Sequence, residues 1–305
     1  MLLPLLFSVL GLHLAEAKTV IHWSVAHDPG NERVLEAIRH FGEEVKAQTK
    51  GEISLQLDEF TRGESNLFKE AADKVESGAV QMSQIGTFTL SRYAPDLDVI
   101  DMPFLFRDHA HAAKVLDGPV GDQLREALLN GSGKKVRAFA FTYSGGYRQV
   151  YGTREIRRVE DFAGLKMYPP GELMGRELLG QLGVRFAGEK AVSLKKDVVS
   201  AFKNGVIDEE EGEYNRLGTI QRLFGNTGKV PVVNETNHSL FLTMIVINEK
   251  FYQSLPKKVR EILAGAARQM ALAEREKLAV LFILREGTTL RTRTTSRWPL
   301  AKESD

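Results

Sequence analysis

Residues 143–171 read YSGGYRQVYGTREIRRVEDFAGLKMYPPG, and this stretch decides how the chain is divided. The apolar strand expected over 136–141 is followed by the pair Gly145-Gly146, and a new extended segment carrying Arg148 begins at once. Glycine permits a sharp change of chain direction, and a guanidinium group binds carboxylates through paired hydrogen bonds. The stretch therefore predicts a crossover between two lobes, with an anion-binding arginine at the mouth of a cleft.

The N-terminal part of the chain alternates between strand and helix patterns. Expected strands at 19–26, 53–57 and 80–85 are separated by stretches with helical spacing of apolar residues. Such alternation is typical of a mostly parallel α/β sheet, whose binding loops lie at the carboxyl ends of its strands. Asn31 follows the first expected strand and is therefore a candidate binding residue.

The C-terminal part is expected to rejoin the first lobe and then end in a long helix. The apolar run at 239–247 should return to the first lobe, and 256–282 has the spacing of one long amphipathic helix. The stretch 285–305 is rich in threonine and arginine, lacks either periodicity, and is expected to be disordered or poorly packed.

Composition excludes several classes of protein. A chain of 305 residues with 43% hydrophobic and 27% charged residues is an ordinary globular protein with room for two lobes. The net charge of +1 argues against a nucleic-acid partner. The absence of cysteine excludes disulfides, thiolate chemistry and cysteine-ligated metal sites. The serines form no nucleophile elbow and no phosphate-binding glycine loop is present, so we expect no catalytic residue and no cofactor.

Residues 1–17 form an apolar run that ends in Ala15-Glu16-Ala17. This pattern is typical of a secretory signal peptide with a small-residue cleavage site, although no basic residue precedes the run. An uncleaved anchor and a buried N-terminal segment are the two alternative interpretations. We expect a signal peptide and a periplasmic mature protein.

Four blocks of sequence resemble a known family. They are residues 102–106 (MPFLF), Gly146-Tyr147-Arg148, residues 160–167 (EDFAGLKM) and residues 204–211 (NGVIDEEE). Between Trp23 and Leu281 the chain resembles the solute-binding receptors of tripartite ATP-independent periplasmic (TRAP) transporters, of the dicarboxylate-receptor type.

The resemblance implies an α/β, type II-like periplasmic binding protein whose two lobes close on a small organic acid, braced by a long C-terminal helix. Such a receptor delivers its ligand to a membrane permease and is not an enzyme; we expect a monomer. The implied division is a signal peptide over 1–17, lobe I over 18–145 plus about 234–273, and lobe II over 146–233 plus about 274–305.

The chain departs from the family at positions that bear on the ligand. Tyr168 stands where the family carries an arginine, and a tyrosine can donate one hydrogen bond but cannot form a charged bidentate pair. Lys195 replaces an aromatic residue and could restore a positive charge, while Gly212 stands where some members have a ligand-binding asparagine. The expected ligand-binding residues are therefore Arg148, Tyr168, Asn31, Lys195, Glu211 and Gly212.

Several features also have plain interpretations. The acidic run 208–211 is expected to be a solvated turn rather than a metal site, and His109 and His111 to be surface residues. Two functional alternatives stay open beside a transport receptor. One is a degenerate receptor fold that acts as a sensor partner or has no transport role, and the other is an enzyme that uses the interlobe cleft.

Overall fold

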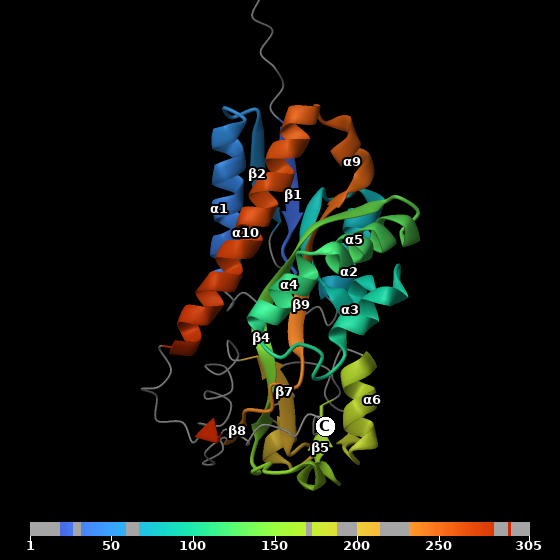
Figure 1. Ribbon diagram of the computed structural model, residues 1–305, viewed down its shortest axis with the longest axis vertical. Coiled ribbons are helices and arrows are strands. Elements are labelled where there is room, and N and C mark those ends of the chain that lie inside the picture. Colours follow the sequence, from blue (N-terminus) through green and yellow to red (C-terminus); the bar gives the residue numbers. More distant parts are fainter. Residues whose placement is uncertain are drawn as a thin grey trace, which may run out of the picture.

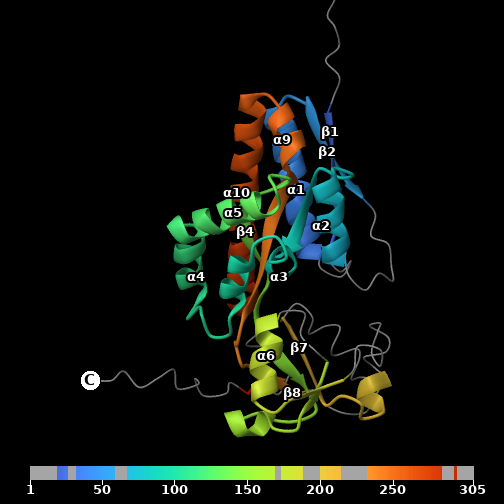
Figure 2. The same ribbon diagram turned by 90° about the vertical axis from the view of Figure 1, so that its right-hand side faces the viewer.

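The structure is a computed structural model, and it describes residues 19–26, 32–58, 67–168, 173–187, 200–213, 232–283 and 292–293. The described chain forms two α/β lobes, one above the other along the long axis (Figures 1 and 2). One sheet runs through both of them, in the strand order β2-β1-β3-β9-β4-β7-β5-β6. The α/β class predicted from strand–helix alternation is therefore confirmed.

The larger lobe is built on the first part of this sheet. β1 (Thr19–Ser24) pairs in parallel with β2 (Ile53–Asp58) and β3 (Met82–Gly86), and β9 (Leu240–Asn248) runs antiparallel to β3. Apolar side chains fill both faces because these strands carry long hydrophobic runs. Four helices that pack in this lobe are α1 (Glu32–Gln48), α2 (Leu67–Ser77), α4 (His109–Leu116) and α5 (Pro119–Gly131).

The strand β4 (Val136–Gly152) crosses from the larger lobe to the smaller one without ending. The predicted break at Gly145-Gly146 is wrong. Instead, the pairing of β4 with β9 shifts register between Tyr143 and Gly146, and Gly146 has a φ of 80°. Glycine adopts this left-handed conformation without strain, so the irregularity is absorbed as a bulge and the strand continues toward Arg148.

The smaller lobe is assembled on the far half of β4. β7 (Glu209–Glu213) pairs antiparallel with β4, and β5 (Lys166–Met167) pairs in parallel with both β7 and β6 (Arg185–Phe186). α6 (Leu173–Gln181) packs Leu179 into a separate apolar core. The other buried members of that core are Val150, Ile156, Phe162, Leu165, Met167 and Val184.

Two residues of the C-terminal tail pair with the sheet, so the expectation of disorder is wrong for 292–293, while the rest of 285–305 lies outside the described residues. β10 (Thr292–Arg293) pairs in parallel with β8 (Val232–Asn234), which in turn pairs with β4. A short strand needs only backbone hydrogen bonds to the edge of a neighbouring strand, so the absence of apolar periodicity did not exclude it.

The predicted signal peptide over 1–17 lies outside the described residues. Within the ranges given above, no helix is both long and apolar enough to span a membrane.

The predicted long helix is confirmed as α10 (Lys257–Ile283), which packs against α1 and β4 (Figure 1). A buried polar cluster fastens it to β4 at the bulge. Gln84 donates to Glu274 Oε2 at 3.0 Å, and Arg33 Nη2 donates to the carbonyl of Ser144 at 2.7 Å. Arg33 Nη1 also lies 3.8 Å from Glu274 Oε1. Because buried polar groups are costly unless paired, this cluster fixes the position of α10 relative to the crossover strand.

Removing a buried side chain from α10 should destabilise the protein. Leu263 is 0% exposed and Leu272 is 46% exposed on the same helix. Leu263→Ala leaves a cavity and should lower the free energy of unfolding by about 2–5 kcal/mol. Leu272→Ala is the matched control and should change it by less than about 0.5 kcal/mol. Urea unfolding followed by circular dichroism checks this, and equal losses for the two variants would contradict the packing of α10.

A buried carboxyl group makes stability depend on pH. Asp101, at the end of the 3₁₀ helix η1 (Pro95–Asp101), accepts hydrogen bonds from the Thr87 hydroxyl at 2.8 and 3.0 Å. Burial raises the pKa of Asp101 from 3.8 to about 7, although the Thr87 hydrogen bonds oppose the shift. The folded protein therefore holds this proton more tightly than the unfolded chain does.

Stability should consequently fall as the pH rises from about 4 through about 7, by on the order of 4 kcal/mol from this group. Asp101→Asn cannot ionise, so its unfolding free energy should fall less over that range. Asp96→Asn, at an exposed position of the same 3₁₀ helix, should follow the wild-type profile. Denaturant unfolding across the pH range checks this; parallel profiles for wild type and Asp101→Asn would refute the assignment.

Candidate functional site

Arg148 lies on β4 where the two lobes join, beside the carboxyl end of β7 in the smaller lobe. It is paired in register with Glu213, the last residue of β7, and its backbone N–H donates to the carbonyl of Ser239 at 2.8 Å. β5 and β7 run in parallel, so their carboxyl ends meet at the same edge of the sheet. Ligand sites in α/β sheets lie at such edges, so the position of Arg148 agrees with a binding role.

The Arg148 guanidinium is buried among charged and aromatic groups, with only 7% of the residue exposed. Its Nη1 atom lies 3.6 Å from Glu211 Oε1 and 3.5 Å from Glu213 Oε1. Its guanidinium carbon lies 4.4 Å from the centre of the Phe241 ring, which supplies a cation–π contact. The arginine is therefore held in place by the fold and already sits in an acidic environment.

His238 extends this group and was missed by the sequence analysis. Its Nε2 lies 2.9 Å from Glu211 Oε1, and its Nδ1 lies 2.8 Å from the Thr236 hydroxyl. A carboxylate only accepts hydrogen bonds, so Nε2 carries the proton. His238 stands on the segment before β9, 27 residues from Glu211. No local motif joins two residues so far apart, and only the pairing of β4 with both β7 and β9 brings them together.

The acidic run is a buried strand, which corrects the expectation of a solvated turn. Every residue of β7 from Glu209 to Glu213 is buried. Burial raises the pKa of Glu209 to about 8, and its Oε1 accepts a hydrogen bond from the Arg154 N–H at 2.9 Å. Charge alone suggested solvent exposure, but pairing with β4 on one side and β5 on the other encloses the strand. Among the described residues, no group of three histidine or carboxylate side chains could hold a metal ion.

The other predicted ligand residues are not all gathered at Arg148. Gly212 pairs with Gln149. This position belongs to the sheet face opposite Arg148, since neighbouring residues of a strand alternate between faces, and glycine has no side chain to place there. Tyr168 directly follows β5 and is half-buried. Asn31 and Lys195 lie outside the described residues. The structure thus brings Arg148 together with Glu211, and adds Glu213 and His238.

His109 is not a surface residue as expected. Its ring lies 5.5 Å from that of Tyr143, nearly parallel to it, and 5.0 Å from that of Tyr147. Burial lowers its pKa, so the neutral imidazole is favoured. The two tyrosines flank the bulge of β4, and His109 at the start of α4 therefore packs against the crossover itself.

A small apolar cavity of about 200 Å³ lies between the lobes beside His238. Phe104 from the larger lobe forms one wall, and α6 with the 3₁₀ helix η2 (Val159–Phe162) forms another. Phe104 also donates its backbone N–H to the carbonyl of His238 at 2.6 Å. The remaining lining residues are Val159, Phe162, Leu178, Leu179, Leu182 and Thr236.

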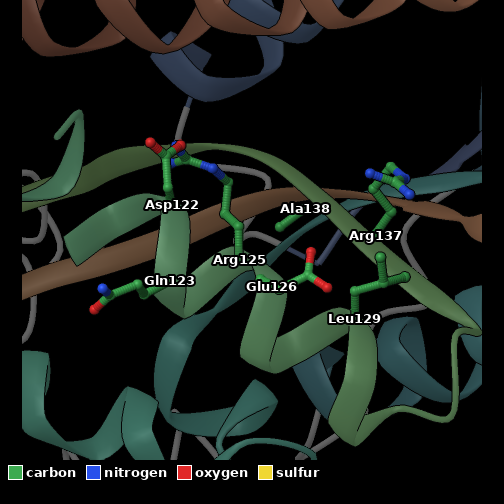
Figure 3. Close-up of a pocket in the computed structure, with 7 residues that line it drawn as sticks. All are labelled: Asp122, Gln123, Arg125, Glu126, Leu129, Arg137 and Ala138. Atoms are coloured by element: carbon green, nitrogen blue, oxygen red, sulfur yellow. The ribbon is translucent and has the colours of Figure 1, made fainter. Parts of the chain in front are cut away.

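A larger groove of about 440 Å³ lies elsewhere, over α5 and the start of β4 (Figure 3). Arg125 in this groove is paired with Asp122 at 2.5 Å, and Arg137 with Glu249 at 2.5 Å. Its guanidinium groups are thus engaged by carboxylates of the same lobe. The groove contains none of the predicted ligand residues, and we place the candidate site at Arg148.

Comparison with solved structures shows the same fold. A TRAP periplasmic solute-binding protein from Ochrobactrum anthropi superposes with a TM-score of 0.78, at 21% identity, over 92% of this chain and 84% of that chain. A TRAP periplasmic solute-binding protein from Pseudomonas putida F1 with bound D-glucuronate gives a TM-score of 0.74, at 23% identity, over 90% and 88% of the two chains. The two-lobe receptor fold expected from the resemblance is therefore confirmed.

Comparison of sequences identifies the family. The 2,3-diketo-L-gulonate-binding periplasmic protein YiaO of Escherichia coli K12 is 27% identical over 246 residues, which is 80% of this chain and 70% of that protein. The C4-dicarboxylate-binding periplasmic protein DctP of Rhodobacter capsulatus is 25% identical over 230 residues, 74% of this chain and 64% of that protein. The profile of bacterial extracellular solute-binding protein family 7, DctP, matches residues 25–281. The chain belongs to this family of solute-binding proteins.

Proposed function

We propose that the protein is a periplasmic receptor that captures a small organic acid between its lobes and delivers it to a TRAP-type permease. The observation that carries the proposal is the buried guanidinium of Arg148 on the crossover strand, linked through Glu211 to His238, which lines the interlobe cavity. Ligands of similar proteins agree with it: YiaO is named for 2,3-diketo-L-gulonate, DctP for C4-dicarboxylates, and the P. putida structure holds D-glucuronate. All of these are carboxylates, which a guanidinium recognises through charge-assisted hydrogen bonds.

We propose that binding proceeds by closure of the lobes about β4 and β9, which pass between them, without chemical change to the ligand. The lobe boundaries inferred from the sequence, the signal peptide and a monomeric state belong to the same proposal. Tyr168 would contribute a single hydrogen bond at the position of the family arginine, so Arg148 would carry the main charge interaction. Asn31, Lys195, Glu211 and Gly212 complete the set of proposed ligand residues.

Arg148→Lys should weaken ligand binding while preserving the fold. A lysine keeps the positive charge next to Glu211 and Glu213 but loses the planar fork that binds a carboxylate bidentately. Affinity for the acid that co-purifies with the protein, identified by native mass spectrometry, should fall at least about tenfold by titration calorimetry. Arg148→Ala should abolish binding.

The matched control is Arg158→Lys, because the Arg158 side chain is 74% exposed on the smaller lobe. It should leave affinity unchanged. Equal affinity of Arg148→Lys and wild type would remove Arg148 from the site. If no organic acid raises the melting temperature of the wild type, the degenerate receptor becomes the better interpretation. Turnover of a bound acid would favour the enzyme.

A further inference from the structure

The apolar cavity of about 200 Å³ between the lobes is distinct from the site at Arg148. Its walls come from Phe104 of the larger lobe, from α6 and η2 of the smaller lobe, and from the segment before β9. His238 of that segment bounds the cavity and donates from Nε2 to Glu211 at 2.9 Å. Glu211 Oε1 in turn lies 3.6 Å from Arg148 Nη1. The His238–Glu211 pair therefore stands between the cavity and Arg148.

The chemistry of the cavity walls suits an uncharged molecule. Apart from Thr236 and His238, the described lining residues are leucine, valine and phenylalanine. The Thr236 hydroxyl donates to His238 Nδ1 at 2.8 Å, so these two polar side chains are engaged with each other. A carboxylate buried among such groups would be costly, whereas an apolar cavity of about 150 Å³ in another protein stays dry and binds benzene. The cavity thus has the size and the lining to hold one apolar ring.

Phe104 forms its wall in a strained backbone conformation. Its φ of 61° lies in the left-handed region, which bulky residues avoid because Cβ approaches the following carbonyl oxygen. The Phe104 N–H donates to the carbonyl of His238 at 2.6 Å, which ties the larger lobe to the opposite wall. Strain of this kind persists only where the surrounding structure imposes it, and it is concentrated at ligand clamps and switch regions. Phe104 is therefore held at the cavity at a cost to stability.

The wall that carries His238 is fixed by the crossover strand. Asn237 has a φ of 45°, and its side-chain oxygen accepts a hydrogen bond from Gln149 Nε2 at 2.6 Å. The Asn237 N–H donates back to Gln149 Oε1 at 3.0 Å. Gln149 lies fully buried on β4, so this pair of hydrogen bonds positions Thr236 and His238 in the absence of any ligand. Small-molecule sites are usually preformed in this way.

We propose that the cavity is a second binding site, which takes a small uncharged molecule with one apolar ring or a branched hydrocarbon chain. Because its walls belong to both lobes, movement of the lobes changes its shape, and an occupant binds the different lobe arrangements with different affinity. Such an occupant alters the affinity for the acid at Arg148, since the two sites are linked through the same lobe equilibrium. The site stands on the cavity alone, and only the coupling rests on the proposed function.

Fluorobenzene is the probe for the second site, because it is a single apolar ring that fluorine NMR detects directly. Wild type should bind it saturably, and the melting temperature should rise with its concentration, as expected for a ligand of the folded state. Benzoate has the same ring with a carboxylate. It should not displace fluorobenzene, because the charge cannot be buried among apolar side chains.

Leu178→Trp fills the cavity from α6 and should weaken fluorobenzene binding at least about tenfold. The matched control is Gln181→Trp, which adds the same indole to an exposed position of the same helix and should bind fluorobenzene as wild type does. If circular dichroism shows that Leu178→Trp is unfolded, Val159→Phe replaces it. Val159 also lines the cavity and is 37% exposed, so the larger ring can be accommodated without disrupting the core.

The coupling is measured by titration calorimetry of the co-purified acid with and without saturating fluorobenzene. The acid affinity of wild type should change by about fivefold or more, and that of Leu178→Trp should not respond. A smaller change in wild type overturns the coupling. Failure of fluorobenzene to bind, or equal binding to wild type and Leu178→Trp, overturns the second site. Neither result touches the proposed function, which fails only if the acid affinity does not depend on Arg148.

Discussion

The burial of a single guanidinium on a strand shared by both lobes is the constraint on which this structure depends. Arg148 cannot be left unpaired in such a place, because an isolated buried charge is far too costly. Its partners come from β7 and its backbone is tied to the segment before β9, so the strands on either side of β4 must both be in register. The same strand pairings therefore hold the charged centre in place and join the two lobes.

The end of the crossover that lies in the larger lobe is held by several contacts besides strand pairing. Arg33, Gln84 and Glu274 connect α1, β3 and α10 to the carbonyl of Ser144. His109 packs against the tyrosines on either side of the bulge. Gly146 follows with its positive φ, two residues before Arg148. We therefore expect relative movement of the lobes to be taken up at and beyond Gly146, which would carry Arg148 and its glutamates with the smaller lobe.

The sequence predicted those parts of the molecule that depend on local patterns. The spacing of apolar residues located α10 to within a residue or two, and strand–helix alternation indicated the α/β sheet of the larger lobe. Arg148 could be singled out because a glycine pair and family motifs surround it. The glycine pair led to the wrong prediction that the strand ends there. A bulge within a strand and the end of a strand have the same local sequence pattern, and only the pairing with β9 distinguishes them.

Long-range pairing produced the features that the sequence did not reveal. A run of five residues with four glutamates suggests an exposed segment, yet β4 and β5 enclose Glu209–Glu213 on both sides. His238 acquires its role only through contact with Glu211, and His109 through contact with Tyr143 and Tyr147. In each case the decisive neighbour is tens of residues away. The acidic surroundings of Arg148, which distinguish this site from a plain anion pocket, therefore emerged only from the fold.

The most direct test of the central claim is a crystal structure of the protein with its co-purified ligand. The account predicts one small carboxylate between the lobes, with a carboxylate oxygen within hydrogen-bond distance of the Arg148 guanidinium. A ligand bound instead in the groove over α5, or bound between the lobes without contact to Arg148, would contradict it.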